Sequence, residues 1–310
     1  MNTLREALCS YLTMRRNLGF KLHSDGKALF DFVSFLDQKG ASHITTSLAL
    51  EWAQKPTKAK PAYWATRLRY VRGFAGYLSA FDKRNEIPAS ELLPYNPERA
   101  RPYLYSDTEI KQLLEAALEY SRTTHFKRRT YYCLFGLLAV TGMRINEALS
   151  LKLKNVDLKA GVLTVEGSKF GKSRLIPLHP STQKILASFI LLRRRFLKGR
   201  RSDFLFISNL GNRLDKGQVS RAFYALSRKI GLRGKNSSSG PRIHDFRHVF
   251  AIKTLIRWYQ RGENVEARLP ILSTFLGHVH VADTYWYLTA CPELMGQAVS
   301  RLETWWGIKS

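Results

Sequence analysis

Two arginines in the second part of the chain stand where packing alone would not select them. Arg144 lies in TGMRINEAL (141–149), directly after a Thr-Gly turn, and Arg247 lies in HDFRHVF (244–250) among apolar residues. A guanidinium group presents a rigid fork of donors that matches two oxygens of one phosphate. Two arginines that converge on a phosphate would neutralise the charge that develops during phosphoryl transfer. Taken alone, Arg144 could instead pair with Glu147 across one helical turn, and Arg247 could face solvent.

Two tyrosines near the C-terminal end are candidates for a nucleophile. Tyr285 and Tyr287 lie in LGHVHVADTYWYLTA (276–290). A tyrosine hydroxyl has a pKa of about 10, so it needs nearby cations or a base before it can attack at neutral pH. Residues two positions apart on a helix point about 200° apart, so only one of the two can face a given pocket.

Two histidines and two lysines could move the protons of such a reaction. His244 and His278 are candidates for proton transfer, and Lys169, in an expected turn, could protonate a leaving oxygen. Neighbouring Lys172 could take the same role. Each residue also has a structural interpretation: a hydrogen-bonded core histidine for His244, a helix cap for His278, and an ordinary turn lysine for Lys169.

The segment HDFRH has a rival interpretation as a metal site. His244 and His248 stand four residues apart with an acid beside the first, as in the zinc-binding H-E-x-x-H arrangement. However, Asp245 is one methylene shorter than the glutamate of that motif, and a catalytic zinc site needs a third protein ligand. Zinc is therefore the minor hypothesis, and we expect neither a metal nor another cofactor.

Taken together, these motifs resemble the catalytic domain of the tyrosine recombinases, the phage integrase family. That family shows a TG-x-R-x-x-E segment, a lysine in a β-turn, an H-x-x-R pair, and LGH followed nine residues later by tyrosine. The matching residues are Thr141, Gly142, Arg144 and Glu147; Lys169; His244 and Arg247; and Leu276, Gly277, His278 and Tyr287. The resemblance covers about residues 103–300. Each motif alone is unspecific, but the full set in this order and spacing is highly specific.

The resemblance implies a site-specific DNA recombinase that serves a mobile element. Tyr287 would attack a DNA phosphate and form a 3′-phosphotyrosyl enzyme, whereas Tyr285 would pack or hydrogen-bond. The other implied roles are phosphate binding by Arg144, Arg247 and His278, proton transfer by His244, protonation of the 5′ oxygen by Lys169, and orientation of the arginine region by Glu147.

The same resemblance implies double-stranded DNA as the partner, enclosed by two domains in a C-shaped clamp. Four copies would assemble on two sites and exchange strands through a Holliday junction, and the protein would be a monomer or weak oligomer without DNA. Accessory DNA-bending or directionality proteins are possible partners. Two alternatives remain open: a DNA-binding relative without catalysis, and an enzyme like the type IB topoisomerases.

Hydrophobic periodicity predicts the elements that must position these residues. Apolar residues recur at helical intervals over 2–19, 25–39, 45–54 and 60–80. We therefore expect a small helical domain over 1–87, and the resemblance implies that it is a core-binding (SAM-like) DNA-binding domain. Pro88, Pro94, Pro97 and Pro102 cannot continue a helix, so we expect a linker over 88–102. The catalytic domain would then span 103–310.

The second domain is expected to be mainly α-helical with a small antiparallel β-sheet, an α+β fold. Ser106 and Glu109 form an S-x-x-E capping box that predicts a helix starting near residue 107. GVLTVEGSKFGKSRLIPL (161–178) alternates apolar and polar residues around a glycine-containing turn, as in a β-hairpin with Lys169 at its tip. Helical patterns then follow over 180–197, 215–230, 245–260 and 293–306.

The charge of the chain indicates an anionic partner. The 310 residues include 50 lysines and arginines against 24 acidic residues, a formal charge of +26. These cations are interleaved with apolar residues, which favours a folded nucleic-acid-binding surface over a disordered tail. The candidates for DNA contact are Lys172, Arg193, Arg194, Arg195 and Arg221. A dense basic run such as the one that contains Arg193–Arg195 is also typical of a solvated helix face.

Other classes of protein are disfavoured. The three cysteines, Cys9, Cys133 and Cys291, have no paired spacing, so we expect neither disulfides nor a thiolate zinc site. The N-terminal segment lacks the long apolar core of a secretory signal, and the longest apolar run is about half of a membrane span. We therefore expect a cytoplasmic, nucleoid-associated protein of prokaryotic type.

Overall fold

The computed structural model describes residues 3–95, 101–167, 173–237, 239–290, 294–296 and 299. The chain forms two compact units, Met1–Ala100 and Arg101–Ser310. Three predicted features lie outside the described residues. They are the turn lysines Lys169 and Lys172, residues 96–100 of the expected linker, and most of the expected helix 293–306. Within the described part of the chain, no helix is long and apolar enough to cross a membrane.

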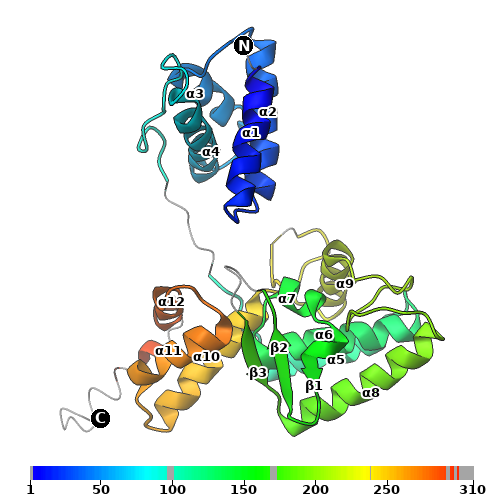
Figure 1. Ribbon diagram of the computed structural model, residues 1–310. Coiled ribbons are helices and arrows are strands. Elements are labelled where there is room, and N and C mark those ends of the chain that lie inside the picture. Colours follow the sequence, from blue (N-terminus) through cyan, green and yellow to red (C-terminus); the bar gives the residue numbers. More distant parts are fainter. Residues whose placement is uncertain are drawn as a thin grey trace. The chain divides into compact units, whose positions relative to one another are not determined.

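The first unit is a bundle of four helices (Figure 1), at the positions that the hydrophobic periodicity predicts. They are α1 (Leu4–Asn17), α2 (His23–Gln38), α3 (Thr46–Gln54) and α4 (Pro61–Ser79). Trp52 is fully buried beside Phe32, and the Arg67 guanidinium lies 3.6 Å from the centre of the Trp52 ring. The buried aromatic residues give this unit a core of its own.

The second unit is mainly helical, as expected, and begins at the predicted cap. The Ser106 hydroxyl accepts from the Glu109 N–H at 3.1 Å, and the Glu109 carboxylate accepts from the Ser106 N–H at 2.7 Å. The helices are α5 (Asp107–Leu118), α6 (His125–Thr141), α7 (Ile145–Ser150), the short 3₁₀ helix η1 (Leu153–Asn155), α8 (Pro180–Leu197), α9 (Lys216–Lys229), α10 (Asp245–Gln260), α11 (Val265–Leu276) and α12 (Ala282–Ala290).

A three-stranded antiparallel sheet with the order β1-β2-β3 lies in this unit (Figure 1). It consists of β1 (Val156–Asp157), β2 (Val162–Val165) and β3 (Arg174–Pro177). Leu163 pairs with Ile176 and Thr164 with Leu175, so β2 and β3 are the arms of the predicted hairpin. Leu163 and Ile176 are buried, whereas Leu175 is exposed, which shows that one face of the hairpin covers the core.

Two hydrophobic clusters meet where the candidate site lies. The larger one joins α5, α6, the sheet, α8 and α9, and the smaller one joins α10, α11 and α12. Phe275 near the end of α11 packs against both clusters, and its ring stacks on Phe250 of α10 at 5.3 Å. The end of α11 is therefore a point at which side chains from the start of α7, from α10 and from β3 meet.

Candidate active site

Arg144 lies at the N-cap of α7, one turn before Glu147. Its backbone N–H donates to Glu147 Oε2 at 2.8 Å, and its Nη1 donates to Oε1 at 3.0 Å. The local pair considered from the sequence is thus present. Nevertheless, the Arg144 side chain remains 32% exposed, so its guanidinium keeps a face toward solvent while one edge is held.

Arg247, in the first turn of α10, does not face solvent: it is only 2% exposed. Its Nη1 donates to the carbonyl of Gly142 at 2.9 Å, and its Nη2 donates to that of Leu276 at 2.6 Å. Burial, and then the charge of Arg144, lower the pKa of Arg247 to about 10. The residue therefore stays cationic at neutral pH in a poorly solvated position.

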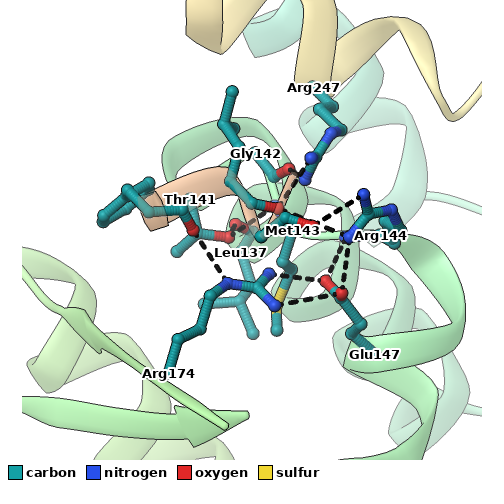
Figure 2. A network of polar contacts seen from close by, with 11 residues as sticks. Leu137, Thr141, Gly142, Met143, Arg144, Glu147, Arg174 and Arg247 are labelled. Atoms are coloured by element: carbon teal, nitrogen blue, oxygen red, sulfur yellow. Dashed lines mark hydrogen bonds and ion pairs between the residues drawn. The ribbon is translucent and has the colours of Figure 1, made fainter. Parts of the chain in front are cut away.

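The two arginines converge on the end of α11. Arg144 donates through Nη2 to the Gly277 carbonyl at 3.1 Å and through Nη1 to the Leu276 carbonyl at 3.4 Å. Arg247 donates to the same Leu276 carbonyl. Figure 2 shows Arg144, Glu147 and Arg247 pointing toward one another. The two guanidiniums therefore share one backbone acceptor, and their joint binding of a phosphate stays a prediction.

A third arginine, Arg174 on β3, was not among the predicted site residues. Its Nη1 and Nη2 donate to Glu147 Oε1 and Oε2 at 3.1 and 2.7 Å, and its Nε donates to the Phe275 carbonyl at 2.8 Å. One signal could have found it. Arg174 stands two positions before Ile176 on the inward face of the hairpin, where a cation requires a partner.

Glu147 is the carboxylate that joins these arginines (Figure 2). Burial favours its protonated form, but the hydrogen bonds and charge of Arg174, together with the hydrogen bonds of Arg144, outweigh burial and leave the pKa of Glu147 below its usual value. It is therefore ionised at neutral pH. Two guanidiniums on this one carboxylate, with Arg247 close enough for its charge to interact, leave the site cationic.

Two glycines allow these segments to approach. Gly142 ends α6 at φ +60°, and a Cβ there would lie 2.7 Å from the Phe250 ring of α10. Gly277 ends α11 at φ +68°, and a Cβ there would lie 2.8 Å from Nη1 of Arg174. Both positions need a residue without a Cβ, because the backbone is left-handed and a neighbouring side chain occupies the space.

The two tyrosines on α12 differ as helix geometry predicts. Tyr287 is 2% exposed and Tyr285 is 49% exposed. The Tyr287 ring lies 6.1 Å from the His278 ring and 5.5 Å from the His248 ring, and an ionised Tyr287 would raise the pKa of Arg247. Tyr287 is therefore buried beside these two histidines and lies close enough to Arg247 for their charges to interact. Tyr285 leaves about half of its surface exposed, so its expected packing or hydrogen-bonding role stays a prediction.

Of the two predicted histidines, His278 stacks on Tyr287, whereas His244 packs on His248, whose ring lies beside Tyr287. His278 follows Gly277, and its Nδ1 lies 2.7 Å from the Thr284 hydroxyl of α12. His244 is the N-cap of α10 but makes no capping bond; burial, and then the charge of Arg247, lower its pKa. His244 is therefore neutral at neutral pH and can accept a proton.

The geometry gives no support to the zinc interpretation of HDFRH. Asp245 is buried, and its carboxylate accepts from the Arg242 backbone N–H at 2.8 Å and from Arg242 Nη2 at 2.9 Å. Across the ranges that the structure describes, no three His, Cys, Asp or Glu side chains gather as metal ligands would. The rings of His244 and His248 instead pack edge to face at 4.8 Å.

The candidates for DNA contact divide into buried and exposed cations. Arg193 is 3% exposed, and its Nε and Nη2 donate to the carbonyls of Phe204 and Ser202 at 2.9 and 2.8 Å. Its assignment to a DNA-binding surface is therefore wrong, because the guanidinium is used inside the unit. Arg194, Arg195 and Arg221 are exposed.

Comparisons with known proteins agree with this arrangement. Residues 104–293 match the model of the phage integrase family. The chain is 57% identical over 310 residues to the putative integrase/recombinase y4rB of Sinorhizobium fredii (strain NBRC 101917 / NGR234), with 99% of each chain covered.

Two solved structures show the same fold at low sequence identity. The Tn1549 transposon integrase in complex with transposon right end DNA has a TM-score of 0.66 and 16% identity, with 96% of this chain and 98% of that chain covered. A lambda integrase tetramer bound to a Holliday junction has a TM-score of 0.60 and 19% identity, with 90% and 78% covered.

Proposed function

Because the chain belongs to the phage integrase family of tyrosine recombinases, we propose that it cuts and rejoins duplex DNA at specific sites through a covalent tyrosine intermediate. The observation that carries this proposal is the meeting of Arg144 and Arg247 at the Leu276 carbonyl, with the buried Tyr287 beside His278 and close enough to Arg247 for their charges to interact. A phosphate beside Tyr287 would meet two guanidiniums at once.

In the proposed cleavage step, the Tyr287 hydroxyl oxygen attacks the phosphorus and forms a 3′-phosphotyrosyl bond. The bond from phosphorus to the 5′ oxygen breaks at the same time. His244, neutral because its pKa is lowered, accepts the tyrosine proton, and Lys169 donates a proton to the departing 5′ oxygen. In the joining step, the 5′ hydroxyl of another strand attacks the phosphotyrosine, and the protons return.

Arg144, Arg247 and His278 are proposed to hold the non-bridging oxygens, which carry the developing negative charge. The burial of Arg247 matters, since a charge pair in a poorly solvated site interacts more strongly than one in water. Because the phosphotyrosyl bond conserves the phosphodiester energy, the reaction needs no nucleotide. The cations would take the place of the metal used by many phosphoryl-transfer enzymes.

The proposed partner is double-stranded DNA. The net charge of +26 supports this partner. A homo-tetramer on two DNA sites, with strand exchange through a Holliday junction, is proposed from the assembly named for the lambda integrase. Service to a mobile element is proposed from the names of the relatives. Arg194, Arg195 and Arg221 stay proposed DNA contacts.

The proposal can be tested with nicked duplexes in which cleavage releases a short strand and blocks religation. The pool should include the flanks of the gene for this protein, and the buffer should contain EDTA. A protein–DNA complex that survives SDS is expected. Failure to form one from DNA that the protein binds tightly would favour the non-catalytic alternative, and full activity in EDTA would exclude a zinc requirement.

A second assay separates a recombinase from an enzyme like the type IB topoisomerases. Two duplexes that carry the cleaved site are mixed with the protein, and joined products between them are counted. A recombinase exchanges strands between the duplexes. A topoisomerase-like enzyme would instead relax supercoiled plasmid as a monomer without joining two sites.

A further inference from the structure

We propose that Arg174 is a positioning residue for DNA cleavage: its two-pronged hold on Glu147 keeps the guanidinium of Arg144 available to the phosphate. This inference rests on the proposed function and adds a residue outside the predicted set. Arg174 is neither nucleophile nor proton donor in it. It acts through Glu147 and through the end of α11.

Glu147 has two carboxylate oxygens, and Arg174 pairs with both of them. Arg174 occupies both carboxylate oxygens with its two terminal nitrogens, at 3.1 and 2.7 Å. The side chains of Arg174 and Glu147 are only 7% and 9% exposed. This is a fork-to-fork pair in a poorly solvated place, the strongest form of an arginine–carboxylate interaction.

Arg144 and Arg174 compete for the carboxylate of Glu147. Arg144 reaches Glu147 with a single side-chain nitrogen, Nη1, because Arg174 already spans the two oxygens. Its other terminal nitrogen therefore points to the Gly277 carbonyl, next to the convergence point with Arg247. Without Arg174, the buried Glu147 carboxylate would draw Arg144 into a full two-pronged pair and away from the phosphate.

Arg174 also contacts the end of α11. Arg174 Nε donates to the Phe275 carbonyl at 2.8 Å, and Gly277 approaches the same guanidinium too closely for a Cβ. The neighbouring Leu276 carbonyl is where Arg144 and Arg247 converge, and His278 comes next. Arg174 thus ties β3 to the turn that accepts hydrogen bonds from Arg144 and Arg247 and that leads into His278.

Three variants test this inference by their single-turnover cleavage rates at saturating DNA, on the duplex to which the wild-type protein attaches most. Arg174→Gln should be about 10²-fold slower, similar to the loss of one preorganised donor, with DNA affinity little changed. Arg174→Lys should recover part of the rate, since it keeps the charge but loses the fork. The double variant Arg174→Gln/Glu147→Gln should cleave about 10-fold faster than Arg174→Gln, because the carboxylate that captures Arg144 is gone.

A purely structural role gives a different pattern. In that case the double variant would be as slow as Arg174→Gln or slower. Arg193→Gln is the matched control, since it also removes a buried arginine that donates to backbone carbonyls in the same unit, but away from this site. It should keep the wild-type cleavage rate.

A duplex with sulfur in place of the departing 5′ oxygen separates the phosphate from the leaving group, because a thiolate leaves without a proton. Arg174→Gln should stay slow on this duplex. Recovery to the wild-type rate would overturn the inference. Arg174 would then act on the protonation of the leaving oxygen, the step proposed for Lys169.

A crystal structure of Arg174→Gln supplies a readout that does not depend on cleavage. Both terminal nitrogens of Arg144 should lie on Glu147, and an unmoved Arg144 would overturn the inference. If wild-type protein formed no covalent complex while Arg144 moved as expected, the proposed function alone would fail. Normal cleavage by Arg174→Gln would refute only the positioning role.

Discussion

Arg144 and Arg247 donate to the same backbone carbonyl, that of Leu276, at 3.4 and 2.6 Å. One arginine comes from the start of α7 and the other from the first turn of α10, so the end of α11 is the place where the two elements meet. The residue after Gly277 is His278, and the next helix carries Tyr287. The groups proposed for phosphate binding and attack are therefore arranged around one turn.

The first prediction concerns the fork of Arg247. Arg247→Lys should lower the rate of covalent complex formation about 10²–10³-fold, because a single ammonium cannot replace a buried guanidinium that donates in two directions. Quenched-flow sampling of the SDS-resistant complex measures this rate. Arg228→Lys is the control and should match wild type. Arg228 lies on α9, and its Nε donates to the Lys235 carbonyl. A rate for Arg247→Lys within threefold of wild type would contradict the proposed role.

The second prediction compares two glycines with nearly the same backbone. Gly277 has φ +68° and Gly262 has φ +67°, but only at Gly277 would a Cβ meet a neighbouring atom, Nη1 of Arg174. Gly262→Ala should therefore lose only about 1 kcal/mol of unfolding free energy from left-handed strain. Gly277→Ala should lose about 1–3 kcal/mol more from overpacking and should also cleave slowly.

Chemical denaturation and the cleavage assay together measure this difference. The comparison isolates the contact with Arg174, since the backbone strain is common to both variants. Equal losses of stability, with equal cleavage rates, would show that the approach of Gly277 to Arg174 has no consequence.

The third prediction is the pH dependence that His244 imposes. Burial and the charge of Arg247 lower its pKa below the usual 6.5, so the native state binds this proton less readily than the unfolded state. The corresponding stability is full above pH 6.5 and is lost as the pH falls through the lowered pKa. The cleavage rate should fall in the same window, because protonated His244 cannot accept the tyrosine proton.

Cleavage rates and unfolding free energies measured between pH 5 and pH 8 test this dependence. His244→Gln should cleave more slowly, and its cleavage rate should no longer fall as the pH decreases below 6.5. The pKa of Glu147 is also lowered, and the stability that this carboxylate contributes is lost only below its usual value of 4.5. If the cleavage rate of His244→Gln fell with decreasing pH as the wild-type rate does, the group that titrates would not be His244.

The fourth prediction follows from the corrected position of Arg193. Arg193→Gln should lower the free energy of unfolding by about 1–3 kcal/mol, because the Phe204 and Ser202 carbonyls lose their charged donor. It should leave the salt dependence of DNA binding unchanged, since the guanidinium is not on the surface. A slope of log K against log salt reduced by about 1 would mean that Arg193 contacts a phosphate after all.

The sequence was sufficient where the signal is local. The Ser106 capping box marks the start of α5, the alternation over 161–178 predicts the β2–β3 hairpin, and helix periodicity separates Tyr287 from Tyr285. The spacing of the motifs also predicts that Arg144 and Arg247 belong to one site. Each of these statements depends on neighbours in the chain or on a complete family pattern.

The sequence was not sufficient where a partner comes from elsewhere in the chain. No sequence pattern around Arg174 predicts that its guanidinium donates to Glu147 and to the Phe275 carbonyl. Arg193 stands in a run of three arginines, and only the packing of residues 202–204 against α8 distinguishes it from its exposed neighbours. Tertiary packing, which periodicity does not encode, decides both cases.

The most direct test of the central claim is to identify the residue that becomes attached to DNA. Wild-type protein is trapped on a nicked duplex in EDTA, denatured, digested, and mapped by mass spectrometry. The modified peptide should carry its nucleotide on Tyr287; Tyr287→Phe should form no adduct, and Tyr285→Phe should form it normally. Attachment at Tyr285, or no adduct on DNA that the protein binds tightly, would contradict the account.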